Sequence, residues 1–122
     1  MNNPCPFCTP ENIVLSNELA YAIFDIYPVN KGHLLIIPKR HVSGFFDTTT
    51  EEREAINELL EQGKSLLEEK YQPDGYNIGI NCGETAGQTI FHVHVHLIPR
   101  YEGDMENPRG GVRGVIPEKR IY

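Results

Sequence analysis

The alternation of hydrophobic and polar positions divides the chain into strand-sized and helix-sized segments. Residues 12–16 and 19–26 are separated by Asn17 and Glu18, and the second run is rich in aromatic and β-branched residues, which predicts a β-hairpin. After a loop with proline and glycine, the almost wholly apolar run from His33 to Ile37 predicts a third strand that Pro38 closes.

One long amphipathic helix is predicted from about residue 50 to residue 70. Thr49 with Glu52 three residues later matches a capping box. Apolar or small residues then recur at helical spacing, at Ala55, Ile56, Leu59, Leu60, Gly63, Leu66 and Leu67. A shorter helical turn is expected near residues 42–46.

Two further segments, 76–81 and 91–97, alternate with a period of two and are predicted to be strands. One set of side chains is apolar and can pack under the helix: Ile78, Ile80, Val93, Val95 and Leu97. The other set is polar: Asn77, Asn81, His92, His94 and His96. An ordinary core does not tolerate such a row without partners, so we expect this face of the sheet to carry chemistry.

The chain shows no internal repeat, low-complexity run or long linker, which predicts a single domain over residues 1–122, with a core at about 5–100 and a tail at 101–122. The tail is polar and glycine-rich, without a detectable period. The expected fold class is α+β, with a five-stranded antiparallel sheet and one long helix.

Composition restricts the possible partners. The longest apolar stretches are far shorter than the roughly 18 residues needed to cross a bilayer, so no membrane association is expected. A formal net charge of −6 opposes binding to a phosphodiester backbone, and we expect no nucleic-acid partner. Three cysteines and the lack of a signal-like N-terminus favour a cytoplasmic protein.

The strongest chemical pattern is His92-Val93-His94-Val95-His96. On a strand, residues two apart share a face at a spacing of about 6.6–6.8 Å, so three imidazoles can address successive groups of a polyphosphate. A neutral imidazole is a competent nucleophile at physiological pH. Two alternatives remain: an exposed histidine strand without function, and a catalytic metal site that uses two of the histidines.

The segment Gly87-Gln88-Thr89-Ile90-Phe91-His92-Val93-His94-Val95-His96-Leu97-Ile98 resembles the signature of the histidine-triad (HIT) family. Phe24-Asp25-Ile26, the run from Gly32 to His41, and Asn81 with Gly83 strengthen the resemblance, which spans about residues 5–100. It implies a HIT-like fold and a homodimer whose two sheets join into one larger half-barrel.

The resemblance also implies roles for individual residues. His94 is implied to attack the α-phosphorus of a nucleotide and form a covalent intermediate that water cleaves. His96 is implied to hydrogen-bond phosphate oxygens near the scissile bond, Gln88 and Thr89 to hold the phosphate and leaving group, and His33 to lie close to the nucleophile. The implied substrate-binding residues are Asp25 and Ile26 for the nucleoside, and Asn81, Gly87, Gln88, Thr89 and His96 for phosphate.

A second candidate site is the Cys5-Pro6-Phe7-Cys8 pair at the N-terminus. This spacing suits a tetrahedral Zn²⁺ that takes two further ligands from elsewhere. The family resemblance suggests His41 and His92 for those positions, and the role of the zinc is then structural. No catalytic metal is expected, because a neutral imidazole is itself a competent nucleophile. A redox pair and chance cysteines are the alternatives. Cys82 is expected to serve packing.

Two arginines in the glycine-rich tail, Arg109 and Arg113, are candidates for gripping phosphates beyond the α position. The alternative is that the tail is flexible or contacts another subunit, and that these arginines do not bind phosphate.

The expected function is hydrolysis of a nucleoside polyphosphate of the diadenosine type, with release of a mononucleotide. Nucleoside phosphoramidase or nucleotidyl transferase activity can use the same site. A nucleotide-binding signalling module with little turnover and a metal-dependent hydrolase are rivals from other classes.

Overall fold

A five-stranded antiparallel sheet with the strand order β1-β2-β3-β5-β4 organises the chain, as predicted. The computed structural model of the protein describes residues 5–122, so residues 1–4 of the predicted domain lie outside the described residues. The strands are β1 (Leu15–Ser16), β2 (Ala20–Phe24), β3 (Leu34–Pro38), β4 (Gly75–Gly79) and β5 (Val95–Arg100). The long helix is α1 (Thr50–Tyr71), and short 3₁₀ turns are η1 (Phe45–Asp47) and η2 (Glu84–Ala86).

The predicted hairpin and the third strand are confirmed, with shorter strands than the hydrophobic runs suggested. The prediction of a strand over residues 91–97 is wrong at its start, because β5 begins only at Val95. Val93 donates its N–H to the carbonyl of Val42 in the loop before η1, at 2.9 Å, instead of joining a strand ladder. The segment that carries His92 and His94 is therefore a loop leading into β5.

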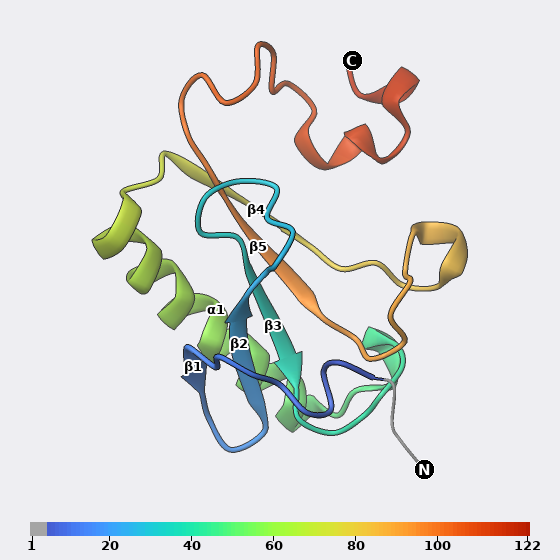
Figure 1. Cartoon of the computed structure of the whole chain (residues 1–122). Coiled ribbons are helices and arrows are strands. Elements are labelled where there is room, and N and C mark those ends of the chain that lie inside the picture. Colours follow the sequence, from blue (N-terminus) through green and yellow to red (C-terminus); the bar gives the residue numbers. More distant parts are fainter. Residues whose placement is uncertain (1–4) are drawn as a thin grey trace.

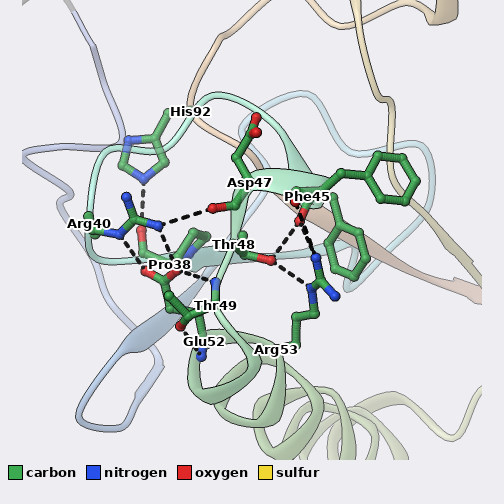
Figure 2. Close-up of polar contacts among 10 residues, drawn as sticks. Pro38, Arg40, Phe45, Asp47, Thr48, Thr49, Glu52, Arg53 and His92 are labelled. Atoms are coloured by element: carbon green, nitrogen blue, oxygen red, sulfur yellow. Dashed lines mark hydrogen bonds and ion pairs between the residues drawn. The ribbon is translucent and has the colours of Figure 1, made fainter.

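Helix α1 begins at the predicted capping box. Thr49 accepts a hydrogen bond from the N–H of Glu52, and the Glu52 carboxylate accepts one from the N–H of Thr49. The same carboxylate is buried and accepts two hydrogen bonds from Arg40, at 3.0 and 2.8 Å, so it is paired although it lies in the interior (Figure 2). The contact ties the end of β3 to the start of α1.

One face of the sheet packs against α1. The core on this side is formed by Ala20, Ala22, Leu34, Ile36, Ile56, Leu59, Leu67, Val95 and Leu97. Gly63 allows the close approach, since a Cβ atom there would lie 3.1 Å from a methyl of Leu34 and 3.2 Å from one of Leu97. The helix and the alternate residues of the strands thus form the packed layer that holds β5 in place.

The opposite face is covered by the N-terminal segment, which crosses the sheet before β1 (Figure 1). Phe7 packs there with Tyr21, Leu35 and Ile37, and its carbonyl accepts a hydrogen bond of 2.5 Å from the Tyr21 hydroxyl. This second, smaller core lies beside the histidine-bearing end of β5.

The tail folds on itself beyond β5, in the 3₁₀ turns η3 (Gly111–Val115) and η4 (Pro117–Lys119) (Figure 1). Gly110 has a φ of 90°, and a Cβ atom at this position would lie 2.0 Å from the carbonyl oxygen of Arg120. Only glycine fits this turn. Within residues 5–122, no helix combines the length and apolar character needed to cross a bilayer.

Candidate active site

A cavity of about 450 Å³ opens on the face covered by the N-terminal segment. His94 and His96 line it from the start of β5, and Asp25 and Ile26 line it from the end of β2. Pro6, Phe7, Thr9, Pro10 and Asn12 of the N-terminal segment form another part of the wall. The sheet thus brings together four of the predicted site residues, from positions about seventy residues apart in the chain.

The ring of His94 has a defined proton position. Its Nδ1 lies 3.1 Å from the main-chain carbonyl oxygen of His92. A carbonyl can only accept, so this nitrogen carries the proton and donates. The other nitrogen, Nε2, then holds the lone pair that a nucleophile needs.

His33 and His96 form a hydrogen-bond chain beside His94. The N–H of Val29 donates to Nδ1 of His33 at 3.0 Å, so a neutral His33 carries its proton on Nε2. That Nε2 lies 2.9 Å from Nδ1 of His96 and donates to it. The proton of a neutral His96 is therefore on its own Nε2, and His96 enters the cavity as a hydrogen-bond donor.

Burial keeps these imidazoles neutral. Burial, together with the neighbouring His94 and His33, lowers the pKa of His96 to about 4, while Asp25 acts against the shift. Burial also lowers the pKa of His33, with Asp25 opposing. The Asp25 carboxylate lies 3.6 Å from Nε2 of His33. These three residues also have the composition of a metal-ligand set, but the 2.9 Å contact between the two ring nitrogens is that of a hydrogen bond.

The ring of His92 does not join the predicted row of three. It is fully buried and turned away from the cavity, toward Cys5 and Cys8. Its Nε2 donates to the carbonyl oxygen of Pro38 at 2.7 Å, which leaves the lone pair on Nδ1 (Figure 2). The expectation that three imidazoles face one ligand is therefore corrected, because the loop before β5 rotates this side chain onto a different group of residues.

That group is the predicted metal set of Cys5, Cys8, His41 and His92, whose ligand atoms all lie within 4.8 Å of one another. Nδ1 of His92 lies 3.4 Å from Sγ of Cys5 and 3.6 Å from Sγ of Cys8, and Nδ1 of His41 lies 3.0 Å from Sγ of Cys8. A tetrahedron with metal–sulfur bonds near 2.3 Å and metal–nitrogen bonds near 2.0 Å has edges of about 3.5 Å. The four donors thus fit one tetrahedral metal ion.

The loop between β4 and β5 holds the predicted phosphate residues outside the lining of this cavity. Gln88 is buried, and its amide is used by the loop itself: it accepts from the N–H of Gly83 and donates to the carbonyls of Ser43 and Ile90. Thr89 is exposed, and Gly87, with a φ of 100°, lies next to the half-buried Asn81. Gln88 therefore shapes the loop.

The two tail arginines are engaged elsewhere. The guanidinium groups of Arg109 and Arg113 lie 4.9 and 4.8 Å from the ring centre of Tyr122, and Arg113 also donates to the carbonyl of Lys119. Neither lines the cavity that contains His94.

Sequence reasoning missed Phe7 and the N-terminal wall of the cavity. The ring centre of Phe7 lies 5.1 Å from that of His94. The position of Phe7 between Cys5 and Cys8 could have indicated this contact. If both cysteines bind a metal at the sheet, the residues between them also lie against the sheet. The donor to His33 is the backbone N–H of Val29, which could not be predicted from residue type because almost every residue has such a group.

Comparison with known proteins finds relatives of this chain. The family model described as the HIT domain matches residues 8–103. A bis(5'-adenosyl)-triphosphatase of Dictyostelium discoideum is 40% identical over 95 residues, which are 78% of this chain and 64% of that protein. An AP-4-A phosphorylase of Mycobacterium tuberculosis strain H37Rv is 36% identical over 93 residues, 75% of this chain and 48% of that protein.

A solved structure has the same fold. The Zn-bound histidine triad family protein from Mycobacterium smegmatis superimposes with a TM-score of 0.77 at 34% identity, and the match covers 85% of this chain and 80% of that one.

The depressed pKa of His96 predicts a loss of stability in acid. The unfolded chain takes up a proton at His96 near pH 6.5 and the folded chain only near pH 4, so the unfolded state binds more protons between these values. Stability should fall as the pH drops through this window, by on the order of 2 kcal/mol for this group. Denaturant unfolding of the wild type and His96→Gln at pH 7 and pH 4.5 measures the difference. A His96 imidazole titrating near pH 6.5 by NMR would contradict it.

Proposed function

This chain belongs to the HIT family, and from that premise we propose that it is a hydrolase that cleaves nucleoside polyphosphates of the diadenosine type at the α-phosphate and releases a mononucleotide. One observation carries the proposal: His94 lines the cavity with its proton held on Nδ1 by the His92 carbonyl, which leaves Nε2 free to attack. The names of the two relatives, a triphosphatase and a phosphorylase of adenosine polyphosphates, support the substrate class.

The reaction has two steps. Nε2 of His94 forms a bond to the α-phosphorus while the bond from that phosphorus to the leaving oxygen breaks, and the leaving group departs with the electron pair. A water oxygen then forms a bond to the phosphorus and the N–P bond breaks. This returns His94, releases the mononucleotide and passes one proton to solvent. His96, a neutral donor on Nε2, stabilises the charge that develops on the phosphate oxygens.

The nucleoside is proposed to occupy the wall between β2 and the N-terminal segment. Asp25, at the end of β2, offers a carboxylate for ribose hydroxyls, and the exposed side chain of Ile26 provides an apolar surface for the base. Asn81, Gly87 and Thr89 are proposed to contact phosphate from the loop between β4 and β5, whose shape depends on Gln88. No role in this site is proposed for Arg109 and Arg113, since both contact Tyr122.

A second candidate function differs only in the molecule that accepts the nucleotidyl group from His94. If inorganic phosphate replaces water in the second step, the product carries one more phosphate and the enzyme is a phosphorylase. The 36% identity to an AP-4-A phosphorylase favours testing this activity directly.

We expect the His94→Ala variant to lose turnover of diadenosine tetraphosphate by at least about 1,000-fold, because the variant lacks the nucleophile. Nucleotide products are quantified by chromatography with and without inorganic phosphate, and adenosine phosphoramidate serves as the alternative substrate. Release of AMP identifies a hydrolase and release of ADP a phosphorylase.

Asn57→Ala, an exposed position on α1, is the matched control and should keep wild-type turnover. If the wild-type protein binds nucleotide but turns over neither substrate, the enzyme proposal is wrong and the protein is a nucleotide-binding module. Activity that disappears when a chelator removes metal from still folded protein, and that survives in His94→Ala, would favour a metal-dependent hydrolase.

The tetrahedral set of Cys5, Cys8, His41 and His92 is proposed to bind a structural Zn²⁺. The thiolate and imidazole donors are those that zinc prefers, and the hydrogen bond from Nε2 of His92 to the Pro38 carbonyl leaves Nδ1 as the ligating nitrogen. The likeness to a Zn-bound relative supports the same metal. Bound there, zinc supplies a cross-link between the N-terminal segment and the sheet.

Cys8→Ser is expected to lose the bound zinc and to lower the free energy of unfolding by several kcal/mol, because metal binding contributes directly to folding. Elemental analysis of the purified protein and denaturant unfolding measure the two effects. Cys82→Ser removes the cysteine outside the cluster and should retain about one zinc per chain. Equal zinc contents in the two variants would refute the site.

A homodimer and a cytoplasmic location complete the proposal. Strand β4 lies at the edge of the sheet and exposes Ile78, which favours pairing with a second copy. Ligation by Cys5 and Cys8 requires reduced thiols, as a reducing cytoplasm provides. Sedimentation of a species with the mass of one chain would contradict the dimer.

A further inference from the structure

Phe7 connects the metal cluster to the nucleophile. It stands between Cys5 and Cys8 in sequence, is only 7% exposed, and directs its ring at two histidines. The ring centres of Phe7 and His94 are 5.1 Å apart with an interplanar angle of 62°, and those of Phe7 and His92 are 6.0 Å apart at 89°. Both are edge-to-face contacts, the favourable geometry for aromatic rings.

His94 needs support that the sheet does not supply. It lies just before β5, so no strand ladder holds its backbone. The hydrogen bond to the His92 carbonyl decides which nitrogen carries the proton, but one hydrogen bond leaves the ring able to swing about it. Two rings flank the imidazole, Phe7 at 5.1 Å and His96 at 5.2 Å between centres. Of these, His96 is fixed by its place in β5 and by His33.

Phe7 is itself held at two places. Its carbonyl accepts the Tyr21 hydroxyl, which projects from β2, and its flanking cysteines meet His92 and His41 in the cluster. The ring is further packed against Leu35 in the smaller core. The position of this ring therefore depends on how the N-terminal segment is anchored to β2, to the smaller core and to the cluster.

We propose that Phe7 is a positioning residue that restricts the ring of His94 to the orientation from which Nε2 attacks, and that the cysteine–histidine cluster acts on catalysis through it. The inference rests on the proposed function of His94. Phe7 needs no contact with the reacting atoms for this role. Misplacement of a reacting group by about 1 Å can cost about 100-fold in rate, so the loss of one of two flanking rings should be visible in kcat.

The test compares Phe7→Leu and Phe7→Tyr with the zinc-loaded wild-type chain of residues 1–122. Phe7→Leu should lower kcat for diadenosine tetraphosphate by about 10-fold and change KM by less than about 3-fold, since orientation is lost and substrate binding is retained. The ¹⁵N signals of the His94 imidazole should change from one tautomer to an average of two. Phe7→Tyr keeps the ring and should restore both readouts.

Tyr21→Phe provides a variant that leaves the cluster and both rings in place. It removes only the hydroxyl that anchors the Phe7 carbonyl, so we expect a smaller change of the same kind, a drop of about 2- to 5-fold in kcat. Ile37→Val is the matched control for damage to the smaller core, because Ile37 is buried in it and does not line the cavity. It should lower stability without changing the His94 signals.

Unchanged His94 signals and kcat in Phe7→Leu would overturn the inference, as would the same spectral change in Ile37→Val. If the wild type has no turnover, the proposed function fails, and the His94 spectra of the same variants still decide whether Phe7 orients the ring.

Discussion

The site depends on the register between β3 and β5. Leu35 pairs with His96 and Leu34 with Leu97, so successive residues of β5 alternate between the helix side and the cavity side. A slip of one residue would turn His96 into the core under α1 and bring Leu97 into the cavity. The apolar packing of Leu34 and Leu97 against the helix makes that slip costly. The same packing that stabilises the fold therefore fixes the chemistry on the other face.

The two faces of the sheet have different covers, and each serves a different purpose. Helix α1 buries a continuous apolar layer, which needs no polar partner. The N-terminal segment covers the opposite face, where the imidazoles of His33, His92 and His96 are buried or half-buried and each has a hydrogen-bond partner. Burial lowers the pKa of all three. A neutral imidazole can donate through one nitrogen and accept through the other, which a charged one cannot.

Local patterns in the sequence were sufficient for much of the fold. The capping box of Thr49 and Glu52 located the start of α1, and its helical period located the face that it buries. Period-two alternation failed for His92, because it describes only residues inside a regular strand, and this residue lies in the loop before one. The role of Phe7 depends on a contact between distant segments, and the donor to His33 is the backbone of Val29. The Cys5–Cys8 spacing indicates only that the residues between the cysteines lie on the sheet, and the contact of Phe7 with His94 and the backbone donor to His33 leave no signal in residue type.

The main-chain carbonyl that fixes the proton of His94 belongs to a residue whose side chain is committed to the metal cluster. Any amino acid at position 92 brings the same carbonyl, so mutation of that side chain cannot delete the acceptor itself. It can only move the acceptor, by changing the path of the loop. The tautomer of the nucleophile is thus insensitive to the side chain at position 92 itself and sensitive to where the chain runs, and a variant far from His94 can impair it by displacing this carbonyl.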